Sequence, residues 1–222
     1  MGASQTVKGT AIVGVIASAA DLRADSKSSD SPDLFELRLD ALIHQLDEAE
    51  RFARRTRVPL IITARHPLEG GFHALNATAR RELITRFSRY AHYIDIELRS
   101  VNSMRRVIDR VDRLIVSVHD FHKTPPVTRM MAKLKVARGA NANVFKIATR
   151  TETPVALSRL LQFVSTTTKE PPIVAMGIGK YGTLSRLLFA RCGSPFVYAA
   201  MSAAVVEGQP TVKQLRSLLS SV

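Results

Sequence analysis

Charged and large apolar side chains alternate in the stretch LFELRLDAL. On an extended strand its charged residues, Glu36, Arg38 and Asp40, share one face, and the large apolar side chains of Phe35, Leu37 and Leu39 share the other. Ionisable groups are costly inside a protein unless they are paired or used. The side of the sheet that this charged face occupies therefore decides whether the segment is a surface strand or part of a site.

A single lysine, Lys146, interrupts the apolar segment NVFKIAT. Burial there would remove most of its hydration, and desolvated lysines commonly act as Schiff-base nucleophiles. A structural lysine held in an ion pair is the alternative. His119 ends the preceding apolar segment in VSVHDF, and an imidazole can move protons near neutral pH. Together the two side chains predict imine chemistry assisted by an acid-base group.

Segments with strand character alternate with segments of helical periodicity along the whole chain. We expect strands at 11–17, 34–39, 59–65, 93–98, 114–119, 144–149, 172–178 and 196–201. We expect helices at 43–57, 76–91, 101–111, 127–140, 153–167, 183–192 and 211–221, and a short one near 19–26. This alternation predicts a single α/β domain over 1–222, folded as a (β/α)8 TIM barrel. A doubly wound open sheet is the alternative.

In such a barrel the outward face of each strand packs under helices and must be apolar. The charged face of LFELRLDAL must then point into the lumen. The same parity places further polar residues inside, namely Thr63, Arg65, Asp95, Glu97, Ser117, His119 and Lys146. Barrel enzymes place their sites at the C-terminal ends of the strands, where these residues gather. A buried salt-bridge network would show the same parity.

Composition narrows the setting. The chain is 45% hydrophobic with a net charge of +13, and its arginines and lysines are spaced as on the wet faces of amphipathic helices. We therefore expect neither nucleic acid nor a membrane as a partner. The segment AIVGVIASAA is interpreted as a buried strand rather than a signal peptide, and MGASQT fits only a loose myristoylation pattern. One cysteine, Cys192, is expected to be buried, and a cytoplasmic location is predicted.

Several motifs, in order, resemble those of one family, the type I 3-dehydroquinate dehydratases. They are FELRLD, IITARHPLEGG, YIDIEL, VSVHDF, VFKIAT, GKYGTLSR and the late EGQ. Singly each motif is weak, but together they run through nearly the whole chain. The resemblance implies dehydration of 3-dehydroquinate to 3-dehydroshikimate in the shikimate pathway through a lysine Schiff base, without a metal or organic cofactor.

The resemblance also implies roles by position. Lys146 matches the imine-forming lysine, His119 matches the general acid and base, and Glu69 matches the glutamate that orients this histidine. The implied partner is a small anionic substrate, and a homodimer is left open.

Five further positions match the family's substrate-binding residues. Glu36, Arg38 and Arg65 match residues that hold hydroxyl groups and order the site. Arg186 matches the arginine that pairs with the substrate carboxylate, and its planar fork could bind both oxygens. Gln209 matches a glutamine on the closing loop after the last strand.

One segment departs from the family pattern. Relatives commonly carry Ser-Ala-Pro-Gly-Gln where this chain has VVEGQ, so Val205 replaces a serine and Glu207 a proline. We expect the loss of one substrate hydrogen bond and an added negative charge near the anion site. Two other functions stay open: another lysine-dependent class I aldolase, and a non-catalytic barrel retained for binding.

Overall fold

The computed structural model describes residues 9–23, 31–167 and 170–221. Within these residues eight strands alternate with eight α-helices. The strands are β1 (Ala11–Ile16), β2 (Leu34–Arg38), β3 (Leu60–Thr63), β4 (Tyr93–Glu97), β5 (Leu114–Asp120), β6 (Val144–Arg150), β7 (Ile173–Ile178) and β8 (Phe196–Ala200). The helices are α1 (Ala19–Arg23), α2 (Leu46–Arg55), α3 (Ala77–Phe87), α4 (Arg105–Ile108), α5 (Val127–Gly139), α6 (Pro154–Thr166), α7 (Gly182–Arg191) and α8 (Val212–Ser220).

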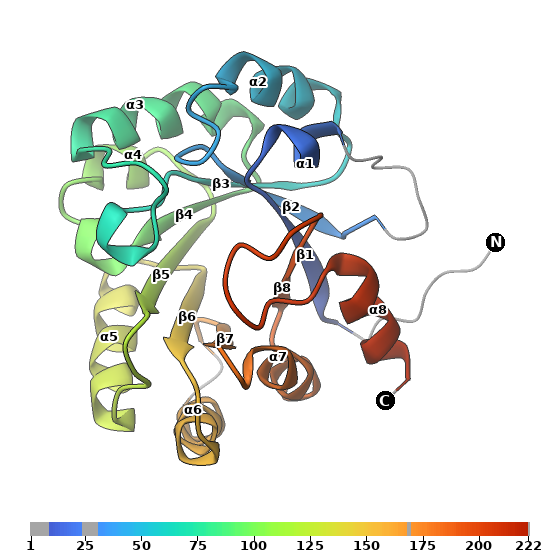
Figure 1. Cartoon of the computed structure of the whole chain (residues 1–222). Coiled ribbons are helices and arrows are strands. Elements are labelled where there is room, and N and C mark those ends of the chain that lie inside the picture. The colour runs from blue at the N-terminus through green and yellow to red at the C-terminus, as the bar shows by residue number, and fades with distance from the viewer. Residues whose placement is uncertain (1–8, 24–30, 168–169, 222) are drawn as a thin grey trace.

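The strands form one parallel sheet that curls into a nearly closed barrel. Its order is β7-β6-β5-β4-β3-β2-β1-β8, so the first strand pairs with both the second and the last. The helices lie outside the strands (Figure 1). The predicted (β/α)8 barrel is confirmed, and the open doubly wound sheet is wrong because β1 pairs with β8. The single-domain prediction over 1–222 stays a prediction, since the MGASQT segment and residues 24–26 of the expected first helix lie outside the described residues.

A seam separates β7 from β8, because no backbone ladder joins these two strands within the described residues. The guanidinium of Arg186, on α7, spans the seam instead. Its Nε donates to the carbonyl oxygen of Tyr198 on β8 at 2.8 Å, and its Nη1 donates to that of Gly177 on β7 at 3.1 Å. Side-chain donors thus replace ladder hydrogen bonds where the barrel closes.

Two apolar layers follow from strand parity. Most outward-facing residues, such as Leu37 and Ile62, pack with the helices in one large cluster, and others from β1 and β8 pack with α7 and α8 in a smaller one. The lumen holds a second cluster drawn from most of the strands and including Val13, Ile115 and Val174. This luminal cluster fills much of the barrel interior, and the charged residues lie among and above it toward the C-terminal ends of the strands.

Strand bounds agree with prediction to within two residues, but two local expectations are wrong. The helix expected over 101–111 is reduced to α4, preceded by the 3-10 turn Leu98–Ser100. Ser103 donates its hydroxyl to the Ser100 carbonyl at 3.0 Å, and such local side-chain bonds compete with a regular helix. Cys192 is exposed rather than buried, because it caps the C-terminus of α7.

Candidate active site

A pocket of about 310 Å³ opens at the C-terminal ends of the strands. It is lined by every site residue that the sequence predicts, namely Glu36, Arg38, Arg65, Glu69, His119, Lys146, Arg186 and Gln209. Apolar side chains complete the wall, among them Val15, Phe72, Phe121, Met176 and Val205. Charged groups from across the chain therefore meet in one cavity with an apolar side.

Lys146 is buried in the lumen, with its side chain 4% exposed. Its Nζ lies 3.2 Å from Oε1 of Glu36 and 3.0 Å from Oδ2 of Asp95. The same nitrogen lies 3.9 Å from the centroid of the Tyr198 ring. Lys146 is thus a buried, ion-paired lysine at the wall of a pocket, a position that is compatible with both interpretations of the sequence.

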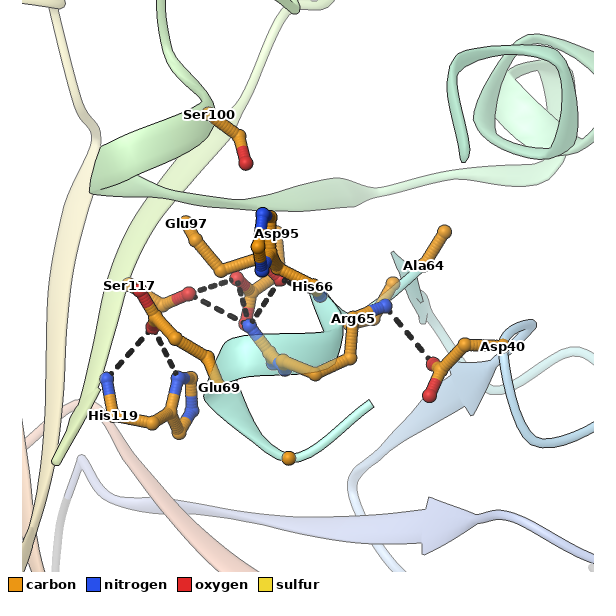
Figure 2. Close-up of polar contacts among 12 residues, drawn as sticks. Asp40, Ala64, Arg65, His66, Glu69, Asp95, Glu97, Ser100, Ser117 and His119 are labelled. Atoms are coloured by element: carbon orange, nitrogen blue, oxygen red, sulfur yellow. Dashed lines mark hydrogen bonds and ion pairs between the residues drawn. The ribbon is translucent and has the colours of Figure 1, made fainter. Parts of the chain in front are cut away.

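Arg65 connects the carboxylates around Lys146. Its Nη2 lies 3.0 Å from Asp95 and 3.4 Å from Glu36, and its Nη1 contacts Glu97 at 3.0 Å. Figure 2 shows Asp95, Glu97 and Ser117 around the Arg65 guanidinium. Burial lowers the pKa of Arg65, but the three carboxylates outweigh it and raise this pKa well above its ordinary value. Arg65 is therefore a permanent cation within the site.

Asp95 has a pKa below its ordinary value, despite complete burial, which by itself raises it. The charges of Arg65 and Lys146 outweigh that penalty. Asp95 thus remains an anion beside the amine. The parity of YIDIEL placed Asp95 in the lumen, but it was not among the predicted site residues, because its contact with Lys146 depends on strands that are not adjacent.

His119 and Glu69 form a hydrogen-bonded pair at the mouth of the pocket. Oε2 of Glu69 lies 3.1 Å from Nδ1 of His119 and accepts from its backbone N–H at 2.8 Å (Figure 2). The other oxygen of Glu69 accepts from Nε of Arg99 at 2.9 Å. Donation from Nδ1–H to the carboxylate leaves Nε2 as the basic nitrogen of the neutral imidazole.

The electrostatics of this pair favour a neutral imidazole. Burial lowers the pKa of His119 well below its ordinary value, and the charges of Arg65 and Lys146 add to the effect. Burial also raises the pKa of Glu69, helped by the nearby charge of Glu97. His119 therefore keeps a free base form to lower pH than an exposed histidine does. The neighbouring His122 is exposed.

Asp40 fixes the position of Arg38. Its carboxylate accepts from Nε and Nη2 of Arg38 at 3.0 and 2.8 Å. It also accepts from the backbone N–H groups of Arg65 and Phe72. Asp40 is fully buried and lies behind Arg38, so it holds the arginine and the loop around Phe72 in place. Parity placed Asp40 in the lumen, but this anchoring role needs the loop geometry.

Arg186 is buried, and burial lowers its pKa to about 10. Nε and Nη1 are engaged by backbone carbonyls at the β7-β8 seam. Nη2 contacts only the Met176 sulfur, at 3.8 Å, among the described residues. Closure of the barrel thus uses two of the three guanidinium nitrogens, and binding of both carboxylate oxygens by Arg186 stays a prediction. One nitrogen remains for a ligand in the pocket.

The segment after β8 closes one side of the pocket. Oε1 of Gln209 accepts from the backbone N–H of Val205 at 2.9 Å. Gly208 has φ +77°, and a side chain there would collide with the carbonyl of Gly179. Glu207 is 62% exposed and pairs with Arg150 at 2.8 Å. Its charge is therefore directed to solvent and compensated, in contrast to the expectation of an added charge at the anion site.

Two further findings concern partners and cofactors. No helix within residues 9–23, 31–167 and 170–221 combines the length and apolar character needed to cross a membrane. Within the same ranges no three His, Cys, Asp or Glu side chains are grouped so that they could hold a metal ion.

Comparison with known proteins gives a consistent result. A family model described as type I 3-dehydroquinase matches residues 11–222. A 3-dehydroquinate dehydratase of Thermococcus gammatolerans is 35% identical over 192 residues, which cover 84% of this chain and 86% of the relative. The 3-dehydroquinate dehydratase of Pyrococcus abyssi is 32% identical over 200 residues, covering 86% and 88%.

Solved structures agree with the sequence matches. A crystal structure of 3-dehydroquinate dehydratase from Geobacillus kaustophilus has a TM-score of 0.80 and 26% identity, and the match covers 95% of this chain and 90% of that one. Because the family model spans almost the whole chain and relatives above 30% identity align along most of their own length, the chain belongs to the type I 3-dehydroquinase family.

Proposed function

We propose that this protein dehydrates 3-dehydroquinate to 3-dehydroshikimate through a Schiff base on Lys146, with His119 as general acid and base. Membership of the family makes it a hydro-lyase of this type. The observation that carries the mechanism is the position of Lys146, whose buried amine lines the pocket that His119 also lines. The two residues come from β6 and β5, which are adjacent strands.

The reaction needs a cationic nitrogen next to the carbon that loses a proton. The neutral amine of Lys146 attacks the C3 ketone, and the ketone oxygen leaves as water with the formation of an iminium ion. This ion withdraws electrons, so a proton can leave the adjacent carbon and the C1 hydroxyl can depart as water. Hydrolysis of the iminium then frees the product and restores the amine.

The charges around Lys146 are compatible with both the neutral amine and the cationic iminium ion. Glu36 and Asp95 stabilise a positive charge at Nζ, whether it belongs to an ammonium or to an iminium ion. When the amine is neutral, Arg65 still contacts both carboxylates, so neither is left as an unpaired buried charge. The site therefore tolerates the neutral nucleophile and favours the cation that the reaction creates.

Substrate orientation is assigned to the remaining polar groups. Arg186 is a buried cation without a carboxylate partner in the described part of the chain, and its Nη2 lies at the pocket wall. It is suited to the substrate carboxylate, while Glu36, Arg38 and Gln209 are placed to bind hydroxyl groups. Val205 lines the same pocket and offers no hydroxyl to the substrate.

The test is borohydride trapping on the purified protein. After incubation with 3-dehydroquinate and reduction, digestion and mass spectrometry should locate a covalent adduct on Lys146. In the unreduced reaction, enone absorbance should rise. A class I aldolase would form the adduct with a different keto compound and produce no enone. A folded protein that gives neither adduct nor enone would contradict the dehydratase mechanism.

The pH profile gives a further prediction for His119. Because its pKa lies well below the ordinary value of 6.5, the imidazole stays neutral as pH falls to that value. The basic form is lost only at lower pH, so kcat/KM should keep most of its plateau value at pH 6.5. Initial rates measured from about pH 5 to about pH 8 check this. An NMR titration in which the His119 imidazole is half-protonated at or above pH 6.5 would contradict the assignment.

A further inference from the structure

Tyr198 belongs to a ring of side chains at the level of Lys146. In a barrel each luminal layer is formed by alternate strands. Here β6 contributes Lys146, and β2, β4 and β8 contribute Glu36, Asp95 and Tyr198. Each of these three residues contacts the lysine nitrogen. Tyr198 is 3% exposed and lines the pocket. Two carboxylates and one aromatic face thus surround Nζ.

The carboxylates contact two cations, whereas the aromatic ring contacts one. Oε1 of Glu36 and Oδ2 of Asp95 each contact Arg65 as well as Lys146. The Tyr198 ring contacts Lys146 at 3.9 Å and no other cation among the described residues. Its attraction for a cation is strengthened because both groups are removed from water. The aromatic face is therefore dedicated to the charge on this nitrogen.

The hydroxyl of Tyr198 has no hydrogen-bond partner in the described part of the chain. Burial raises its pKa well above the ordinary value, and the charges of Glu36 and Asp95 act in the same direction. The ring therefore stays neutral, as a cation-binding face requires. The contact with Lys146 is made by the ring face, so the hydroxyl takes no part in it.

We propose that Tyr198 stabilises the positive charge of the iminium ion at Lys146 through its ring face, as a further residue that determines the rate of this reaction. The inference rests on the proposed Schiff base. One neutral amine, one ketone and one proton give the iminium ion and one water, so the positive charge appears on the nitrogen that faces the ring. An aromatic face stabilises this cation and leaves the neutral amine nearly unaffected.

Two substitutions separate the ring from the hydroxyl. Tyr198→Phe keeps the face, and Tyr198→Leu removes it. Purified proteins are mixed with 3-dehydroquinate, quenched with borohydride at successive times, and the labelling of Lys146 is measured by mass spectrometry. We expect Tyr198→Phe to label within about threefold of the parent and Tyr198→Leu to label about tenfold more slowly, which corresponds to about 1.4 kcal/mol. Equal labelling by parent and Tyr198→Leu, or equal losses in both variants, would overturn the inference.

Ring fluorination provides a measurement at nearly constant shape. Phenylalanines with increasing fluorine content are placed at position 198, and the fraction of Lys146 trapped at saturating substrate is measured. The fraction should fall stepwise as fluorine withdraws electron density from the ring face, whereas a packing role predicts no trend. This series also decides the question if Tyr198→Leu does not fold. Absence of any adduct in the parent protein is a different result, because it contradicts the Schiff base itself.

Discussion

Lys146→Ala should abolish dehydration of 3-dehydroquinate, with kcat reduced by roughly 10⁴-fold or more. No other lysine lines the pocket within the described residues, so no second amine can form the iminium ion. Without that ion the proton next to the ketone loses its electron sink. The measurement is the rate of enone absorbance at saturating substrate, together with the loss of the borohydride adduct.

Charge and nucleophilicity at this position can be separated. Lys146→Arg keeps a cation beside Glu36 and Asp95 but cannot form an imine, so it should be as inactive as the alanine variant while remaining folded. Lys135→Ala, at an exposed position on α5, serves as the matched control and should retain full activity. Activity in Lys146→Arg above a few per cent of the parent would show that Lys146 acts through its charge rather than as a nucleophile.

We expect these variants to fold because Arg65 still pairs with the carboxylates that Lys146 contacts. Removal of one partner from a buried ion pair typically costs about 3–5 kcal/mol when the other charge is left alone. Here Asp95 and Glu36 keep their contacts with Arg65 at 3.0 and 3.4 Å. Thermal unfolding should therefore show a smaller loss for Lys146→Ala than for Arg65→Ala, because the second variant removes three buried ion pairs and leaves Glu36 and Asp95 to share Lys146 alone.

The barrel was predictable because its signals are local. Each strand carries its own alternation of apolar and polar residues, and parity alone assigns Glu36, Thr63 and Lys146 to the lumen. The helix expected over 101–111 is shorter than predicted because of side-chain contacts that the periodicity of the sequence does not reveal. Buried Arg80, from α3, donates to the Ser100 hydroxyl at 3.1 Å and pairs with Glu97, which holds the preceding turn, Leu98–Ser100, in place, and Ser103 bonds back to that turn.

The contacts of the site were less predictable than its members. Lys146 contacts Glu36, which is 110 positions away in the sequence, and also the ring of Tyr198. Both contacts exist only because closure of the barrel stacks luminal side chains in layers. Arg186 shows the same limit. The motif that matches a carboxylate-binding arginine does not predict the β7-β8 seam. There, two nitrogens of Arg186 donate hydrogen bonds to the carbonyl oxygens of Tyr198 and Gly177. Closure is a property of the whole sheet, so no local pattern records it.

His119→Ala should lower kcat by about 10²- to 10⁴-fold, the usual range for loss of a general acid-base group. The effect is smaller than for Lys146 because the nucleophile, Asp95 and the substrate-binding groups remain. Both formation and hydrolysis of the iminium ion need proton transfers, so both should slow. A slowly formed adduct should then persist and still be trapped on Lys146 by borohydride, whereas Lys146→Ala gives no adduct at all.

The exposed His122, three positions away, provides the matched control, and His122→Ala should behave like the parent. Glu69→Gln tests the link between the two residues, since Oε2 of Glu69 contacts Nδ1 of His119 at 3.1 Å. An amide in its place can accept the same hydrogen bond but cannot stabilise the imidazolium that forms after proton transfer. It should therefore lower kcat less than His119→Ala does, and leave the KM nearly unchanged. A His119→Ala protein within tenfold of the parent kcat would instead assign proton transfer to another group, and the persistent adduct would be absent.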